Sequence, residues 1–495
     1  MKQTRTLFLN MAAGLGKQVV TLLCGFILPR FMLISYGSTV NGLISTITNY
    51  LSFIALLEMG VGAVIQSNLY EPLAVKDNDE VSRIIKSSQR FFQKIAMILI
   101  IYIVVLIALF ITVFDFPFDS FFCISLLIIV ASSTFSQYFF GITYQLLLNA
   151  DQKSYVTMTI SLLAIVCNTI ASIILMKAGA SIHLVEAVSS LIFMMRPVAQ
   201  KVYINRHYTI DTKIKLTYEP IKQKWNGFSQ HIASVICQNV DIAVLSVFST
   251  LENVSIYSIY YMVIYGVEQI VLTAATGIES FFGNMLASKE LNLLNCAFNA
   301  IEIATHFFVI IIFTTLSIVI VPFIELYTSD IIDINYKAPI FGTVLSLAYA
   351  SLCLRIPYFR LIKASGHFKE TQNGAYISAI INVIVTAVGV RLFGLVGTAF
   401  GTLFAMLYHT IYFALYLRRN IIKRSIWIFI KHMAVDIIII CLSYFVTKNI
   451  FWTGDTYTDW FLYSLKIGIT VVGISMLCSL VAFPRTLLAM IKKKK

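Results

Sequence analysis

Two uninterrupted apolar runs, at residues 95–113 and 307–321, limit most strongly what this chain can fold into. Runs of this kind are typical of helices that cross the hydrocarbon core of a bilayer. A membrane β-barrel would instead show alternating segments of about ten residues. The chain is 58% hydrophobic and only 12% charged, whereas soluble domains carry about 25% charged residues. We therefore predict an all-α polytopic membrane protein and exclude a water-soluble enzyme.

Fourteen segments are apolar and long enough to be transmembrane spans. At roughly 24 residues each they would use about 340 residues, which leaves only short connections in a chain of 495. No soluble catalytic domain fits in the remainder, so we expect a transporter and not an enzyme. The predicted spans are 7–33, 40–67, 93–113, 121–147, 155–176, 183–203, 226–248, 255–286, 298–323, 338–361, 372–390, 395–416, 432–450 and 460–483.

The 37 Lys and Arg residues are distributed unequally between the two ends of the predicted spans. The two chain termini and the even-numbered connections carry 28 of them, and the odd-numbered connections carry four. Because cytoplasmic loops are enriched in Lys and Arg, this asymmetry predicts that both termini are cytoplasmic. The net charge of +13 is then a property of the cytoplasmic face and gives no reason to expect a nucleic-acid partner.

Two stretches of the first half recur in the second half at one constant spacing, called the repeat offset below. Residues 40–43 and 254–257 open the second and eighth spans, and residues 148–151 and 362–365 end the fourth and tenth. This order predicts two parallel six-helix repeats plus two C-terminal helices, and parallel repeats are typical of secondary transporters. The predicted domains are six-helix bundles at 1–203 and 226–416, a cytoplasmic linker at 204–225, and two additional helices with a basic tail at 417–495.

Four basic residues inside the predicted spans are candidate ligands for an anionic substrate. A charge at membrane depth costs about 2.5–3.5 kcal/mol on insertion scales, so it is expected to face a cavity or a partner. Lys17 lies on a polar face of the first span, and His231 follows it at the repeat offset. Arg30 and Arg355 could give bidentate hydrogen bonds to an anionic headgroup. The alternative for Lys17 is a buried structural pair with an acid such as Glu58.

Acidic residues inside the spans are candidates for coupling transport to an ion or a proton. They are Glu58, Asp241, Glu268, Glu279 and Glu302. For Asp241 the alternative is an interhelical hydrogen-bond anchor. Glu302 and His306 are one helical turn apart, which suits either a proton relay or a simple hydrogen-bonded pair.

The sequence contains no motif for ATP hydrolysis and no spacing that predicts a metal site or a cofactor. There is no G-x-x-x-x-G-K-[ST] loop, whose backbone would cradle nucleotide phosphates. The eight cysteines are scattered without a C-x-x-C pair, so we interpret them as small hydrophobic residues. Energy for transport is then expected from an ion gradient, the membrane potential or the substrate gradient.

Several short motifs, in order along most of the chain, resemble Wzx-type polysaccharide and oligosaccharide flippases of the multidrug/oligosaccharidyl-lipid/polysaccharide superfamily. The resemblance extends at least through the twelfth predicted span. The motifs are Asn41-Gly42-Leu43, Glu58-Met59-Gly60-Val61-Gly62, Leu69-Tyr70-Glu71-Pro72-Leu73-Ala74, Gln238-Asn239-Val240-Asp241, Arg355-Ile356-Pro357-Tyr358, Lys363-Ala364-Ser365-Gly366 and Gly397-Thr398-Ala399-Phe400-Gly401-Thr402.

The resemblance implies a MATE-like fold and a flippase that works by alternating access. The implied substrate is an undecaprenyl-pyrophosphate-linked oligosaccharide, turned over in the bacterial cytoplasmic membrane for assembly of capsule or a similar surface polysaccharide. A cationic cavity would replace water around the pyrophosphate and sugars while the lipid tail stays in the bilayer. The partners expected are membrane lipid, Na⁺ or H⁺ as coupling ion, and a polysaccharide polymerase acting on the product, and we expect a monomer.

Three alternatives remain open at this point. A cation-coupled multidrug antiporter would share the fold, although several intramembrane cations disfavour a carrier of cationic drugs. A lipid II flippase is nearly indistinguishable by sequence. A membrane polysaccharide polymerase belongs to another functional class, and the short outer connections disfavour it.

Overall fold

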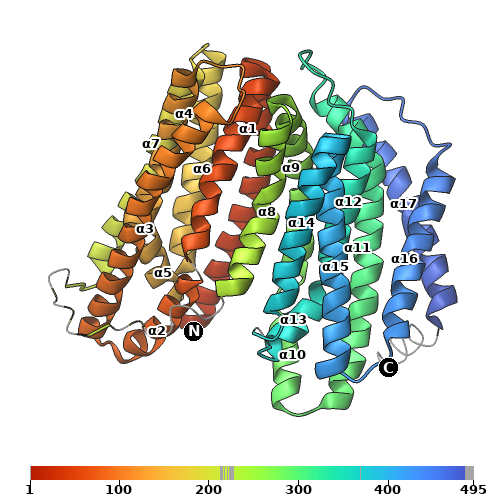
Figure 1. Ribbon diagram of the computed structural model, residues 1–495. Helices are drawn as coiled ribbons and strands as arrows, with labels where there is room; N and C mark the ends of the chain where they lie inside the picture. The colour runs from red at the N-terminus through yellow and green to blue at the C-terminus, as the bar shows by residue number, and fades with distance from the viewer. Residues whose placement is uncertain are drawn as a thin grey trace. The chain divides into compact units, whose positions relative to one another are not determined.

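The computed structural model describes residues 2–58, 60–211, 214, 216, 218–219, 221, 228–367 and 369–484. These residues form helices, and no strand is present among them (Figure 1). Up to residue 207 the elements are α1 (Lys2–Ser52), the 3₁₀ turn η1 (Phe53–Glu58), α2 (Val61–Val75), α3 (Asn78–Thr112), α4 (Ser120–Ser136), the π-helical turn η2 (Gln137–Gly141), α5 (Ile142–Ala150), α6 (Ser154–Lys177) and α7 (Ile182–His207). The later elements are α8 (Phe228–Phe248), α9 (Leu251–Ala274), α10 (Ile278–Ala287), α11 (Leu291–Tyr327), α12 (Pro339–Leu354), α13 (Ile356–Ala364), α14 (Gln372–Phe393), α15 (Leu395–Asn420), α16 (Ile426–Thr447) and α17 (Tyr457–Ala482).

The fourteen predicted spans are confirmed. Twelve helices of the described chain are long and apolar enough to cross a membrane, and α8 adds the shorter apolar segment Ile232–Phe248. The first of the twelve, Phe8–Glu58, has 51 residues and covers two predicted spans. Gly37 separates them, because its backbone (φ 79°, ψ 176°) is not helical and lies in a region that essentially only glycine adopts. The protein is therefore a multi-pass membrane protein.

The helix boundaries repeat at the offset that the sequence indicates. Helix α5 ends at Ala150, and α13 ends at Ala364, which is the corresponding position of the second half. The break in α1 at Gly37 corresponds to the interruption between α8 and α9, and the π-helical turn η2 corresponds to the α12–α13 break at Arg355. The two halves therefore share one order of helices and also the places where the helices are interrupted. Helices α16 and α17 follow the second repeat.

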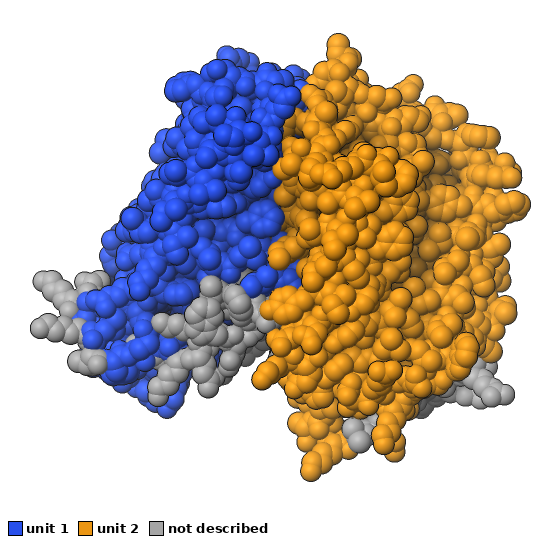
Figure 2. All heavy atoms as spheres, in the orientation of Figure 1, with its two compact units in different colours: residues 1–235 blue, residues 236–495 orange. Residues whose placement is uncertain are grey.

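The chain forms two compact units, Met1–Val235 and Ile236–Lys495 (Figure 2). The boundary between them falls inside α8. The second unit thus contains most of α8, the remaining helices of the second repeat, and the added helices α16 and α17. The finer domain limits expected from the sequence, including the linker at 204–225, stay a prediction.

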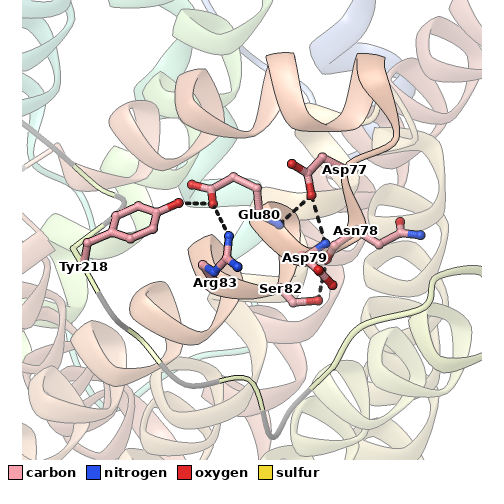
Figure 3. Close-up of polar contacts among 7 residues, drawn as sticks. All are labelled: Asp77, Asn78, Asp79, Glu80, Ser82, Arg83 and Tyr218. Carbon is pink, nitrogen blue, oxygen red and sulfur yellow. Dashed lines mark hydrogen bonds and ion pairs between the residues drawn. The ribbon is translucent and has the colours of Figure 1, made fainter.

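The first turn of α3 shows how polar residues stabilise a helix end in the first unit. Asp77 is the N-cap, and its Oδ1 accepts hydrogen bonds from the backbone N–H of Asp79 at 3.1 Å and of Glu80 at 2.9 Å. Such a cap satisfies N–H groups that have no partner within the helix. Glu80 also pairs with Arg83 at 3.0 Å and accepts a hydrogen bond from the hydroxyl of Tyr218 (Figure 3). A residue of the predicted linker is therefore attached to α3.

Candidate functional site

Asp241 is a buried carboxylate surrounded by hydroxyl groups within the second unit. Its side chain lies on α8 and is 3% exposed. Oδ2 accepts hydrogen bonds from Tyr257 on α9 at 2.9 Å and from Thr402 on α15 at 2.5 Å. Oδ1 accepts one from Thr386 on α14 at 3.3 Å, and Thr386 also donates to Asn382 Oδ1 at 3.1 Å. These five residues, called the Asp241 cluster below, join four helices around one acidic group.

Glycines bring α14 and α15 close enough for the threonines of this cluster to reach Asp241. A Cβ atom on Gly397 would lie 2.0 Å from the carbonyl carbon of Gly389, and one on Gly401 would lie 2.0 Å from Thr386 Oγ1. Small residues of this kind allow close approach of helix backbones in membranes. The contact between α14 and α15 therefore fixes the positions of Thr386 and Thr402.

Only part of the Asp241 cluster has a counterpart in the first unit. At the repeat offset, Asn168 and Ser172 on α6 correspond to Asn382 and Thr386. Ser172 donates to Asn168 Oδ1 at 3.4 Å, as Thr386 does to Asn382. The position of Asp241 itself is taken by Ile27. The second unit thus carries a charge beside a polar pair that both repeats possess.

Arg355 forms a second polar group in the same unit, at the break between α12 and α13. Its Nη1 donates to His409 Nδ1 at 2.8 Å. Because a guanidinium can only donate, His409 Nδ1 acts as the acceptor, and a neutral ring then carries its proton on Nε2. Glu268 on α9 is 8% exposed and interacts electrostatically with Arg355. Arg355, a predicted substrate ligand, and Glu268, a predicted ion-coupling residue, therefore interact with each other.

A larger charged network links the added helix α16 to the second repeat. We call it the Glu302 network, and it comprises Glu302, His306, Tyr358, Arg424, His432 and Asp436. Glu302 is fully buried, pairs with Arg424 at 2.6 Å, and accepts a hydrogen bond from Tyr358. His306 Nδ1 lies 2.6 Å from Asp436 Oδ2, and its ring stacks on that of His432 at a centroid distance of 4.7 Å.

The predicted pair of Glu302 and His306 is therefore part of a contact between helices. The charged partner of each residue follows the second repeat in the sequence. Arg424, the partner of Glu302, lies in the α15–α16 connection, and Asp436, the partner of His306, lies on α16. This arrangement suits an attachment of α16 to α11.

Glu279, at the start of α10, is paired with two cations of α13. Its Oε2 lies 3.1 Å from Arg360 Nη1 and 3.3 Å from Lys363 Nζ. The three side chains are 25–35% exposed, so water or a ligand can reach them. The local charge is +1, because two cations share one carboxylate.

The remaining candidates belong to the first unit. Glu58 is half-buried and accepts a hydrogen bond at 2.6 Å from the hydroxyl of Tyr138, which belongs to the π-helical turn η2. Lys17 and Arg30 are half-buried on α1. Among the described residues no ion pair between Lys17 and Glu58 is present. The side chain of His231 lies outside the described part of the chain, although its backbone belongs to α8.

The sequence interpretation missed the residues that complete these groups. Thr386, Thr402 and Tyr257 have no charge, so a search for charged residues inside spans passes over them. His432 and Asp436 were detectable, because an imidazole and a carboxylate one helical turn apart are unusual in an apolar helix. The described residues contain no group of three or more His, Cys, Asp or Glu side chains that could hold a metal ion.

Comparison with solved structures identifies the fold. The lipid II flippase MurJ in an inward closed conformation matches with a TM-score of 0.72 and 16% identity, over 97% of this chain and all of MurJ. An inward-facing multidrug resistance MATE family transporter matches with a TM-score of 0.64 and 14% identity, over 82% of this chain and 94% of that one. The fold is MATE-like.

A third structure with this fold is a MOP superfamily transporter from Pyrococcus furiosus, described as having a binding pocket of reverse polarity. It matches with a TM-score of 0.52 and 13% identity, over 83% of this chain and 96% of that one. No protein-family model and no curated protein sequence matches this chain. The MATE-like fold implied by the resemblance is confirmed by structure alone.

Proposed function

We propose that this protein is a flippase that moves polyprenyl-pyrophosphate-linked oligosaccharides across the bacterial cytoplasmic membrane by alternating access. The observation that carries the proposal is the length of the likeness to MurJ. The match covers 97% of this chain. The unmatched remainder is too short to hold α16 and α17, so the likeness includes these added helices. MurJ is a flippase of lipid II, a lipid-linked saccharide, and the motifs of this chain resemble oligosaccharide flippases. Both relationships favour a lipid-linked saccharide as substrate.

In this proposal the basic residues of the spans bind the pyrophosphate, and a polysaccharide polymerase uses the translocated product. Lys17, Arg30, His231 and Arg355 are the proposed ligands, with both termini in the cytoplasm. Arg355 is the best supported of them, because it lies at a helix break and its hydrogen bond to the imidazole of His409 uses only Nη1. A guanidinium of this kind keeps free N–H groups for a phosphate oxygen.

The Asp241 cluster is the proposed ion site. It offers carboxylate, hydroxyl and amide oxygens from four helices, and oxygen atoms are the ligands that hard cations prefer. Binding of Na⁺ or H⁺ at a point where four helices meet could favour one conformation over another, as alternating access requires. The same cluster supports the second candidate function, a cation-coupled antiporter with a MATE-like fold.

Reconstitution in vesicles tests the flippase directly. Purified protein is placed in vesicles with a polyprenyl-pyrophosphate oligosaccharide, and an impermeant glycosidase reports the fraction of sugar that is accessible outside. We expect the protected fraction to become accessible only with the protein. We expect Arg355→Gln to slow this at least about tenfold, equivalent to about 1.4 kcal/mol, and Arg355→Lys to slow it less.

Lys466→Gln is the matched control, because Lys466 is also an intramembrane cation but is exposed on α17. Equal flipping in the Arg355→Gln and Lys466→Gln proteins would contradict the role of Arg355. Transport of lipid II with no transport of the oligosaccharide lipid would assign the substrate to the alternative flippase class. Exchange of a cationic dye for Na⁺ or H⁺, without movement of either lipid, would instead support the antiporter.

A further inference from the structure

An apolar groove of about 410 Å³ lies on the second unit, between α9 and α11. Its lining includes the small side chains of Ala274 on α9 and Ala304 on α11, which leave room that larger residues would fill. Large apolar side chains such as Ile270 and Phe308 also line it and are 58% and 61% exposed. Of the twelve residues that line it, Thr305 is the only one with a polar side chain.

Eleven of the twelve lining residues belong to two membrane-spanning segments, Leu251–Ala287 and Asn292–Tyr327, and Ile356 belongs to a third, Pro339–Ala364. A hydrocarbon chain is the chemical group that fits a groove of this polarity in such segments. Its size falls in the range of about 300–1,000 Å³ that small-ligand sites occupy. A space bounded mainly by one pair of helices suits a single chain better than the two chains of a phospholipid.

The fold does not require an apolar groove at this place. At the repeat offset, Ala304 and Phe308 on α11 correspond to Arg90 and Lys94 on α3. Both of these basic residues are exposed in the first unit. The repeat therefore tolerates long charged side chains here, and the apolar lining is a property of the second unit alone.

One end of the groove is next to the cationic group of α10 and α13. Ile278 lines the groove and precedes Glu279, and Ile356 lines it one helical turn before Arg360. Arg360 and Lys363 share one oxygen of Glu279, so most of their N–H donors are not used by that carboxylate. A guanidinium and an ammonium with free donors are suited to a phosphate group.

We propose that this groove and the Arg360–Lys363 pair bind the isoprenoid chain and the phosphate of a polyprenyl-phosphate lipid. The site would hold the substrate at the membrane face where the cationic end lies, and it is distinct from the Asp241 cluster. The proposal rests on the proposed flippase function. The positive-inside distribution predicts that this end is cytoplasmic, the face where the lipid-linked saccharide is expected to be made.

Photolabelling tests the site without requiring transport. The full-length protein in phosphatidylcholine nanodiscs is exposed to a polyprenyl phosphate that carries a photoreactive diazirine on its isoprenoid chain and has no sugar. We expect labelled peptides from the regions 270–278 and 301–312. Filling the groove with Ala304→Trp should reduce this labelling about tenfold, and Arg360→Gln with Lys363→Gln should weaken binding of the probe by a similar factor.

Ala108→Trp is the matched control, because Ala108 is an exposed alanine in the membrane-spanning part of α3. Equal labelling of the Ala304→Trp and Ala108→Trp proteins would overturn the proposal. Competition by phosphatidylglycerol as effective as that by unlabelled polyprenyl phosphate would also overturn it, since the groove would then hold any anionic lipid.

The two proposals fail in different ways. Absence of flipping by the unaltered protein, with the groove still labelled, would refute the flippase but support the lipid site. Flipping by the unaltered protein, with no label in its groove, would refute the lipid site alone. The charge substitutions keep the test informative if tryptophan disturbs folding, because they lie on partly exposed side chains.

Discussion

Helices α3 and α11 occupy corresponding places in the two repeats but bury different side chains. Glu302 and His306 are buried on α11, and the corresponding positions on α3 hold Ser88 and Phe92, which are equally buried. The surroundings of the two helices differ as well. Part of α11 is covered by α17, where Ile467 packs against Val319. Outer residues of α3 such as Ile101 and Val104 are exposed.

The comparison teaches that the charges of α11 belong to the attachment of the added helices. Lipid tails are as apolar as leucine, so apolar contact alone gives little reason for α16 and α17 to stay on the bundle. Hydrogen-bonded ion pairs supply a specific contact, because each buried charge is costly without its partner. The first repeat carries no added helices, and an uncharged pair is sufficient there.

The largest effect is expected from breaking the Glu302 network. Glu302→Ala would leave Arg424 buried without its counter-charge, and removal of one partner of a buried pair typically costs about 3–5 kcal/mol. Ser88→Ala at the corresponding position of α3 should cost about 1 kcal/mol or less. Thermal unfolding in detergent, followed by loss of soluble monodisperse protein, compares the two variants.

The double variant Glu302→Gln with Arg424→Gln separates attachment from general damage. We expect it to be more stable than Glu302→Ala, because no unpaired charge remains. If Glu302→Ala unfolds at the same temperature as Ser88→Ala, the network has no role in holding α16.

The second largest effect is expected at the contact of α14 with α15. Gly401 corresponds to Ala187 in the first unit, so alanine is tolerated there. In the second unit a Cβ on Gly401 would lie 2.0 Å from Thr386 Oγ1 and 2.8 Å from its backbone N. Gly401→Ala should therefore destabilise the protein by about 1–3 kcal/mol, as overpacking does, and should move Thr386 away from Asp241.

The reverse exchange, Ala187→Gly, is the control. It should cost only about 0.5–1 kcal/mol, the usual penalty for glycine inside a helix. Thermal unfolding again measures both, and ion-dependent transport in vesicles reports on the Asp241 cluster. Gly401→Ala with unchanged stability and unchanged ion dependence would mean that the close approach is not needed for the cluster.

Much of the fold could be predicted because the bilayer imposes it on the sequence. Apolar runs predicted the spans. Gly37 and Pro357 lie where the helices are interrupted. The constant offset between corresponding stretches indicated two repeats, although the sequence identity between the two halves is slight. Side-chain partners could not be predicted in the same way, because Arg424 and Asp436 reach Glu302 and His306 only after about 120–130 intervening residues.

The charged residues of the candidate site can be selected from the sequence, but their surroundings cannot. Asp241 stands out as an acid in an apolar helix, whereas Thr386 and Thr402 look like ordinary packing residues until α14 and α15 are placed together. A sequence search for charges therefore finds the centre of such a cluster and misses the hydroxyl groups around it. It also treats Asp241, Glu279 and Glu302 alike, although one is surrounded by hydroxyls and the other two are paired with cations.

The smallest effect is expected from a pair of tyrosines that the two repeats share. Tyr358 on α13 donates a hydrogen bond to the carboxylate of Glu302. Tyr144, at the corresponding position of α5, accepts one at 3.2 Å from the uncharged amide of Gln89. A hydrogen bond to a charged group is worth about 1.5–3 kcal/mol, against about 0.5–1.5 kcal/mol for a neutral one. We therefore expect Tyr358→Phe to lower stability by about 1 kcal/mol more than Tyr144→Phe.

This difference also tests what the Glu302 network does. In the Glu302→Gln background the acceptor of Tyr358 is neutral, so the additional cost of Tyr358→Phe should fall to that of Tyr144→Phe. The four unfolding temperatures form a double-mutant cycle, which isolates the interaction of Tyr358 with the charge from the loss of the hydroxyl itself. If the cost of Tyr358→Phe is the same with glutamate and with glutamine, the charge of Glu302 serves Arg424 alone. The tyrosine would then be a feature shared by the two repeats and independent of α16.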